Sequence, residues 1–362
     1  MSVLIYLESL LGIILNCGGG PGGGYIGGKY WHDPGAFNNG FKGLCSVFVN
    51  AAFAFSGTEL VGLAAAETAN PRKTLPKATK QVFWRICLFY ILSLTLVGLL
   101  VPYDDPQLSI HSSSADARAS PFVIAIRNAR ISGLPHVMNA VILVAVLSVG
   151  NSAVYGTSRT LAALADQGQA PQFLGHIDRR GRPIVAILFI SAFGLLCFLA
   201  ASDKQEEAFN WMMAISGLSG IFTWGSICLA HIRFRRAWKL QGFTMRDLAW
   251  RSQTGLAGSW IGLFLNALVL VAQFWVGFAP IGCSEMNTLT LVVNWFRSYL
   301  GLPVVLLFYL PYKIYFRTPF VRARNMDLKT GRREFDVKQL LEEERADQAD
   351  WPLWKKVYTI LC

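Results

Sequence analysis

The chain has 362 residues, of which 53% are hydrophobic and only 15% are charged. A soluble domain normally carries about 25% charged residues, so this composition, with a mean hydropathy of +0.40, favours a membrane protein. The formal charge of +11 admits nucleic acid or an anionic membrane surface as a partner. Seven cysteines are scattered without a Cys-x-x-Cys pair, which argues against a metal site or a disulfide framework.

Eight apolar stretches are candidates for membrane-spanning helices, each of which needs about 20 mostly apolar residues. In chain order they are Val3 to Asn16, which is short, then Ser46 to Ala66, Val82 to Val101, Val137 to Ala162, Ile184 to Ala201, Ala208 to Ala230, Gly255 to Gly277 and Leu289 to Leu310. The sequence therefore predicts an all-α polytopic membrane protein, with a transmembrane bundle over residues 1–310 and a tail over residues 311–362.

Lysines and arginines in the connections set the orientation of the bundle, because positively charged connections stay in the cytoplasm. One alternate set of connections holds 24 of these residues and the other set holds six. The rich set consists of residues 68–82, 163–183, 231–254 and 311–362, and the poor set of residues 17–45, 102–136, 202–207 and 278–288. We therefore place the rich set, including the tail, in the cytoplasm. Topology explains the net charge, so we expect no nucleic acid as a partner.

Two outer connections have features of their own. Residues 17–45 begin with NCGGGPGGGYIGGKYWHDPG, and because no Gly-Lys-Ser/Thr follows, we interpret this stretch as a flexible external loop rather than a phosphate-binding loop. Residues 102–136 contain SPFVIAIRNARISGLP, in which apolar residues lie beside Arg127 and Arg130. This segment predicts a short helix lying on the outer membrane surface.

The second expected span contains FAFSGTELVGLAAAE, in which polar residues interrupt an apolar run at positions 56–59. Gly57 weakens a helix by about 1 kcal/mol relative to Ala, and the hydroxyls of Ser56 and Thr58 can bond backbone groups that a break would free. Discontinuous helices of this kind mark the binding sites of secondary transporters. Glu59 adds a carboxylate at membrane depth, and because burial disfavours the charged form, we expect it to exchange a proton near neutral pH. The alternative is close helix packing, with Glu59 as a neutral hydrogen-bonding strut.

The fourth expected span carries polar residues on one helical face, namely Ser148, Asn151, Ser152, Tyr155 and Arg159. This stripe predicts either a cavity lining or hydrogen bonds between helices, and Asn151 and Ser152 are the better site candidates.

The sixth expected span has Ser216 and Gly220 four residues apart, with Gly217 and Ser219 between them. Small residues at this spacing indicate close helix packing, with a kink facing a pore as the alternative. His231 follows at the cytoplasmic boundary and is interpreted as an interfacial anchor rather than a proton relay. No nucleophile and base pair, cofactor loop or metal-ligand cluster occurs at a useful spacing, so we do not expect an enzyme or a cofactor.

Three long motifs resemble the fungal amino acid permeases of the amino acid-polyamine-organocation superfamily. They are FSGTELVGLAAAETANPRKTLPKA, SVGNSAVYGTSRTLAALADQGQAPQFLGHIDRRGRP and AISGLSGIFTWGSICLAHIRFRRAWKLQG, and the likeness runs in order over essentially the whole chain. The resemblance implies a leucine-transporter-like fold of twelve spans with two inverted repeats, the second at about residues 46–231 here. It also implies proton-coupled amino acid import across a fungal plasma membrane, with the lipid bilayer, protons and an amino acid as partners.

The resemblance also assigns roles to single residues. Phe53 and Phe55 match aromatic positions that cover the substrate. Ser56, Gly57 and Thr58 match an unwound segment whose carbonyls meet the α-amino group of the amino acid. Glu59 matches an acidic position linked to proton coupling. The polar stripe with Asn151 and Ser152 matches a helix that lines the pathway.

The chain departs from the family pattern at its start, which corresponds to the fifth family helix. Family helices one to four are then missing, and with them the glycine-rich break that holds the substrate carboxylate. We expect a fragment or truncated product. The alternative function is a non-transporting membrane protein, either a sensor of amino acids or an inactive product retained in the endoplasmic reticulum.

The tail ends with WPLWKKVYTILC, where aromatic and basic residues suit the cytoplasmic membrane interface. Cys362 is an acylation candidate in this setting. Related permeases end in an aromatic residue and a palmitoylated Cys, whereas Leu361 takes the aromatic position here, so a free thiol is the alternative. A trafficking chaperone and the ubiquitin machinery, acting on tail or loop lysines, are further expected partners.

Overall fold

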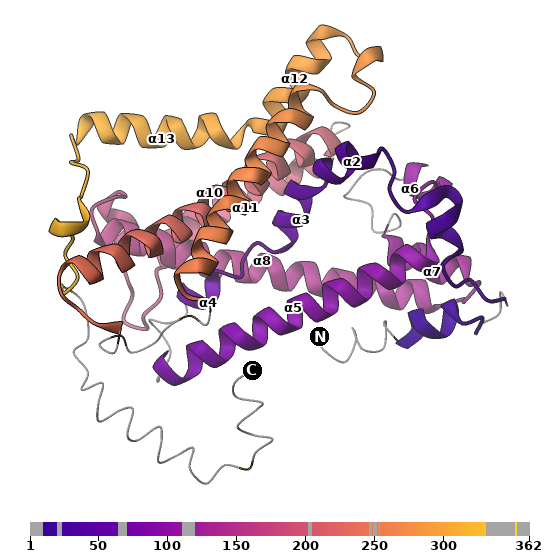
Figure 1. The fold of residues 1–362 in the computed structure, drawn as a ribbon, viewed down its shortest axis with the longest axis horizontal. Helices are drawn as coiled ribbons and strands as arrows, with labels where there is room; N and C mark the ends of the chain where they lie inside the picture. Colours follow the sequence, from indigo (N-terminus) through magenta and orange to yellow (C-terminus); the bar gives the residue numbers. More distant parts are fainter. Residues whose placement is uncertain are drawn as a thin grey trace. The chain divides into compact units, whose positions relative to one another are not determined.

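A computed structural model describes residues 10–19, 24–63, 71–110, 120–201, 205–245 and 254–330, with single positions at 248, 252 and 352. Within these ranges every regular element is a helix (Figure 1), which confirms the all-α prediction for this part of the chain. Cys362 and the first residues of the short first span lie outside the described residues.

The chain divides into two compact units, described here one at a time. Unit 1 consists of residues 1–38, 57–67 and 81–210, and unit 2 of residues 39–56, 68–80 and 211–362. One boundary falls between Ser56 and Gly57, inside the interrupted span. Two further boundaries fall inside long helices, α5 (Pro71–Leu100) and α10 (Gln205–Leu240), so both helices contribute residues to each unit.

The remaining helices of unit 1 come from three stretches of chain. They are helical residues 10–16, the π-helical turn η1 (Trp31–Gly35), α4 (Leu60–Leu63), α6 (Pro106–Ile110), α7 (Pro121–Asn128), α8 (Leu134–Asp166), η4 (Gln172–Gly175), α9 (Ile184–Gly194) and η5 (Leu195–Ala201). Helix α8 contacts α4, α7, α9 and η4, so it is the central scaffold of this unit.

The core of unit 1 forms where α7 meets the end of α5. Ile124 and Ala125 of α7 pack with Leu15, Leu100 and Val101 in one buried cluster. The short helix predicted within residues 102–136 is therefore present, while its setting on the outer membrane surface stays a prediction. Protein rather than lipid covers its apolar face, because these side chains find apolar partners within the unit.

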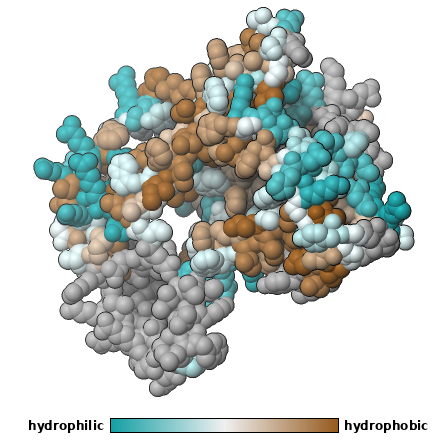
Figure 2. Space-filling model, turned by 45° about the vertical axis from the view of Figure 1, so that its right-hand side comes forward, coloured by the Kyte–Doolittle hydropathy of each residue, from teal (hydrophilic) through white to brown (hydrophobic). Residues whose placement is uncertain are grey.

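Unit 2 is assembled around α10 and α11 (Gly255–Phe278). Its other elements are α2 (Gly40–Ser46), α3 (Phe48–Ala54), η7 (Cys283–Glu285), α12 (Thr288–Tyr299), α13 (Gly301–Tyr315) and η8 (Ala323–Asn325). Helix α11 contacts α2, α3 and α12. Apolar side chains such as Phe264 and Val271 of α11 remain exposed, and hydrophobic surface is extensive in the space-filling view (Figure 2), as expected for helices that face lipid.

Glycines in unit 2 allow very close helix contacts. A Cβ atom built on Gly217 of α10 would lie 2.8 Å from Cγ1 of Val49 in α3, and one on Gly301 would lie 2.8 Å from Cβ of Leu218. The small residues of the sixth span thus pack helices, as predicted, although the contact is made by Gly217 and not by Gly220, which has nothing within 4 Å of a built Cβ. Helix α10 is continuous through this region, which contradicts the kink alternative.

The structure contains some of the eight expected spans as long helices and others as short, bent or broken helices. Among the described residues, four helices are long and apolar enough to cross a membrane, namely Thr74–Leu100, Leu134–Asp166, Glu207–Leu240 and Gly255–Phe278. The last expected span is split into α12 and α13, which meet at an angle of 58°. The fifth is a shorter apolar helix, Ile184–Leu199, and the second is broken between α3 and α4. The count of eight spans stays a prediction.

The basic C-terminal half of α10 makes two contacts that the sequence did not reveal. His231 Nδ1 lies 2.6 Å from Oγ of Ser259 in α11, so this side chain bridges two helices instead of acting only as an interfacial anchor. The Arg233 guanidinium stacks on the ring of Phe320 at 4.5 Å and donates to the carbonyl of Val321. The first residues after α13 are thereby fixed to α10.

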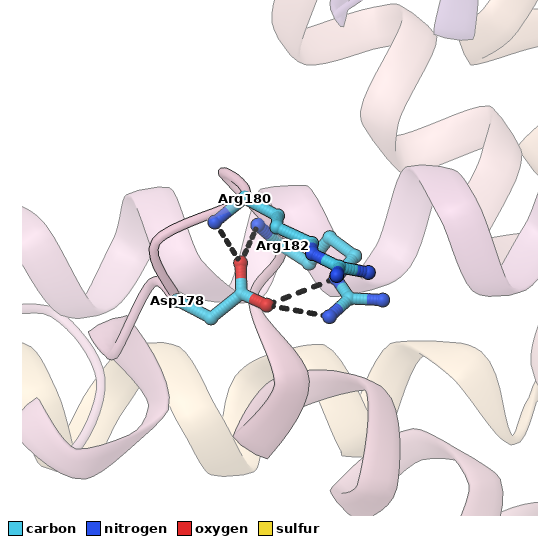
Figure 3. Close-up of polar contacts among 3 residues, drawn as sticks. All are labelled: Asp178, Arg180 and Arg182. Carbon is cyan, nitrogen blue, oxygen red and sulfur yellow. Dashed lines mark hydrogen bonds and ion pairs between the residues drawn. The ribbon is translucent and has the colours of Figure 1, made fainter.

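The connection between α8 and α9 is an ordered turn. Oδ1 of Asp178 accepts hydrogen bonds from the backbone N–H groups of Arg180 at 2.9 Å and Arg182 at 2.7 Å (Figure 3). Oδ2 accepts from Nε and Nη2 of Arg182 at 2.9 and 2.8 Å. Hydrogen bonds from the backbone and side chain of Arg182 lower the pKa of the Asp178 carboxyl below its usual value of 3.8.

Exchanging Gly301 for a larger residue tests the close contact with Leu218. Because the Leu218 side chain is fully buried, Gly301→Ala should destabilise the protein by about 1–3 kcal/mol. Gly220→Ala is the matched control and should be neutral or stabilising by up to about 1 kcal/mol. The midpoint of thermal unfolding in detergent measures both, and equal midpoints for the two variants would contradict the packing.

The Asp178 turn should respond to pH. Because the folded-state pKa of Asp178 lies below its unfolded value, its stabilisation is present above about pH 4 and is lost as the pH falls through the folded pKa. Amide hydrogen exchange of Arg180 and Arg182, corrected for intrinsic rates, should show protection at neutral pH that disappears in Asp178→Asn. Asp166→Asn, just before the turn, is the control and should keep the protection. Unchanged protection in Asp178→Asn would show that the carboxylate does not organise the turn.

Candidate functional site at the broken helix

The interrupted span is broken as its sequence predicts. Helix α3 ends at Ala54 and α4 begins at Leu60. The residues between them form turns, in which Phe55 N–H donates to the carbonyl of Ala52 at 3.0 Å and Leu60 N–H donates to the carbonyl of Gly57 at 3.1 Å. Gly57 has a φ of +92°, a left-handed conformation that only glycine adopts without strain. This glycine therefore sets the direction in which the chain leaves the break.

Glu59 stabilises the break through its side chain. Its carboxylate accepts the backbone N–H of Gly57, with N···O distances of 3.3 Å to Oε1 and 3.2 Å to Oε2. A backbone N–H released from a helix in hydrocarbon needs a new acceptor, and a carboxylate is a stronger acceptor than a neutral group. The conformation of the break therefore depends on the acceptor strength of Glu59. This contact is what the strut alternative describes, and it leaves proton exchange by Glu59 a prediction.

The second half of the broken span is docked on α8. Gly156 of α8 is buried, and a Cβ atom built on it would lie 2.5 Å from Cδ2 of Leu60, the first residue of α4. A larger residue at position 156 would force the end of the Leu60 side chain to move. Asn151 and Ser152 lie on the same helix about one turn before Gly156. The docking thus brings Leu60 and the end of the break to the part of α8 that carries the polar stripe.

The polar stripe of α8 lies outside the packed face of this helix. Ser148, Asn151, Ser152 and Tyr155 are exposed, whereas Gly156, Ala162 and Ala165 are buried. The Ser152 hydroxyl donates to the carbonyl of Ser148 in its own helix at 3.0 Å. The Arg159 guanidinium stacks on the Tyr155 ring at 3.7 Å. The choice between a cavity lining and hydrogen bonds to a neighbouring helix stays a prediction.

The predicted site residues belong to both units. Gly57, Thr58, Glu59, Asn151 and Ser152 are in unit 1. Phe53, Phe55 and Ser56 are in unit 2, and the side chain of Phe53 lies outside the described part of the structure. The chain passes from one unit to the other inside the break.

The sequence placed Gly217 in a predicted packing motif but gave no indication of Gly156, and it identified the neighbour of neither glycine. Gly156 fixes α4 and Gly217 fixes α3. The sequence shows only that a glycine lies on each long helix close to the polar residues discussed above. The role of each glycine depends on which neighbouring helix approaches it, and a single sequence does not give that information.

Comparison with known proteins identifies the family. Residues 2–325 match the family described as amino acid permease. The chain belongs to the amino acid permease family. It is 55% identical over 98% of its length to a general amino-acid permease of Saccharomyces cerevisiae and 58% identical over 98% of its length to one of Candida albicans. A histidine permease of Saccharomyces cerevisiae is 52% identical over 94% of the chain.

The match covers only part of each relative. The chain spans 59% and 60% of the two general permeases and 57% of the histidine permease. No solved structure matches the chain. Membership of a transporter family agrees with the expectation that the chain is not an enzyme, and it makes the broken span the site to test.

Replacing Gly57 tests the conformation of the break. Gly57→Ala places a Cβ in the left-handed region and should cost about 1–2 kcal/mol. Gly62→Ala, in α4 with nothing within 4 Å of a built Cβ, should be neutral or slightly stabilising. Thermal unfolding in detergent compares the two, and a Gly57→Ala protein as stable as the control would contradict the left-handed conformation.

Enlarging Gly156 tests the docking of α4. Gly156→Val should displace Leu60 and accelerate amide hydrogen exchange of residues 57–63 several-fold, because that segment would lose its packing partner. Gly150→Val introduces the same side chain into the same helix at a position with nothing within 4 Å of a built Cβ, and it should leave these amides unchanged. Equal exchange in the two variants would show that α4 does not depend on Gly156.

Proposed function

We propose that the chain forms part of a proton-coupled amino acid symporter that imports its substrate across a fungal plasma membrane. The observation that carries this proposal is the broken span, with a left-handed Gly57 and a carboxylate on its freed N–H, in a chain of the amino acid permease family. A break at membrane depth is tolerated only where protein or a cavity replaces the lost hydrogen bonds, and transporters build substrate sites at such breaks.

In this proposal the eight expected spans correspond to family helices five to twelve of a leucine-transporter-like fold. The second inverted repeat then covers about residues 46–231, and residues 311–362 form the cytoplasmic tail. The broken span is the first helix of that repeat. Support comes from the order of the helices and from the break itself, which separates α3 from α4.

The substrate is an amino acid held by its polar backbone groups. Carbonyl oxygens of Ser56, Gly57 and Thr58 accept the α-amino group, because a helix that stops leaves its last carbonyls without intrahelical donors. Phe53 and Phe55 cover the substrate, and Asn151 and Ser152 line its path on the exposed face of α8. General amino-acid permeases among the relatives support a broad substrate range.

Glu59 couples the proton to the substrate site. Protonation converts its carboxylate into a weaker acceptor for Gly57 N–H, so binding a proton loosens the contact that fixes the break. Proton binding therefore changes the conformation of the segment that holds the substrate. Acylation of Cys362, a trafficking chaperone and ubiquitination belong to the same proposal as features of the plasma-membrane protein.

The test is uptake of labelled amino acids by yeast lacking its own permeases. The chain is expressed alone and joined to the portion of the general amino-acid permease that the match leaves out. We expect accumulation that a proton uncoupler abolishes, and a loss of at least tenfold in Glu59→Gln with normal amounts at the cell surface. Asp104→Asn makes the same acid-to-amide change at an exposed position and should retain uptake.

Two results would overturn parts of this proposal. Uptake that is indifferent to the uncoupler would refute proton coupling while leaving transport intact. Accumulation that survives Glu59→Gln would assign Glu59 to the strut role. A protein that reaches the surface in both forms and accumulates nothing would point to a non-transporting sensor.

A further inference from the structure

The connection between α8 and α9 combines exposed cations with exposed apolar side chains. Residues 167–183 contain three arginines and one aspartate, and the distribution of lysine and arginine along the chain places this connection at the cytoplasmic surface. Asp178 forms an ion pair with Arg182. The charges of Arg179 and Arg180, both exposed, are thus not neutralised by the aspartate that shapes the turn.

This connection has a fixed shape rather than that of a flexible tether. Leu174 in η4 is 3% exposed, and η4 packs on both α8 and α9. A Cβ built on Gly175 would lie 3.4 Å from Cβ of Ala165 near the end of α8. The Asp178 turn fixes the other half (Figure 3). The side chains on the outer face are therefore presented together.

Two large apolar side chains lie on this outer face next to the arginines. Phe173 is 60% exposed and Ile177 is 58% exposed, although their neighbour Leu174 is buried. Exposed apolar groups of this size are unfavourable in water. They are stable at a membrane interface, where rings insert beside lipid headgroups. The same interface favours arginine, whose guanidinium binds phosphate through paired hydrogen bonds.

We propose that residues 172–182 bind the phosphate headgroups of anionic phospholipids in the cytoplasmic leaflet, with Phe173 and Ile177 inserted between the lipids. Arg179 and Arg180 supply the charge, and Asp178 positions them by holding the turn. The connection lies between two apolar helices that end at Asp166 and begin at Ile184, so a lipid surface is within its reach. A soluble phosphate compound as the ligand is an outcome of the test.

The experiment titrates the detergent-solubilised full chain with phosphatidylserine and with phosphatidylcholine, and native mass spectrometry gives the apparent Kd of the bound lipid. The wild-type protein should prefer phosphatidylserine. The double variant R179Q/R180Q should bind phosphatidylserine about 25-fold more weakly. Each cation near an anionic surface lowers the Kd about fivefold. The matched control R127Q/R130Q removes two exposed arginines from the predicted outer side and should bind like wild type.

A further variant and competition with soluble compounds identify the ligand. Phe173→Ser should weaken binding of phosphatidylserine, and glycerophosphoserine, which has the headgroup without acyl chains, should compete poorly. Equal affinities for the two lipids, or equal losses in both double variants, would overturn the proposal. Strong competition by glycerophosphoserine or inorganic phosphate would overturn the lipid assignment in favour of a soluble ligand.

Discussion

The hydrogen bond from the Gly57 amide to the Glu59 carboxylate is the contact on which the account of this protein depends. In a membrane, each backbone group that leaves a helix must find another partner. The chain meets this requirement locally, with a glycine whose φ of +92° turns the backbone and an acid that accepts the released N–H. The side chain that accepts the released N–H of Gly57 is therefore also an ionisable carboxyl group, that of Glu59. That combination is what a proton-coupled binding site requires.

The surrounding helices hold the two halves of the broken span at separate points. Leu60 of α4 contacts Gly156 of α8 in unit 1, and Val49 of α3 contacts Gly217 of α10 in unit 2. Each half is therefore fixed to a long helix at a glycine, while the residues between them are not helical. The non-helical residues from Phe55 to Glu59 thus join two helical segments that are each fixed within their own unit.

Hydrophobicity and local composition predicted much of this arrangement. Long apolar runs predicted α5, α8, α10 and α11, and the polar interruption at positions 56–59 predicted the break. The partner of Glu59 could not be predicted, since it depends on the backbone conformation of Gly57. Gly156 was missed, and the neighbour of Gly217 could not be predicted, because a close approach is a property of two elements. Helix α7 was placed on lipid because its sequence is amphipathic, and periodicity does not distinguish lipid from the side chains of Leu15 and Leu100.

The central claim is that the charge on Glu59 controls the conformation of the break. Amide hydrogen exchange of residues 57–60, measured at neutral pH in the wild-type protein and in Glu59→Gln, tests this claim most directly. The wild-type protein should protect these amides at neutral pH, whereas replacing the carboxylate by an amide should leave them with low protection. Protection that is equal in the two proteins would contradict the account.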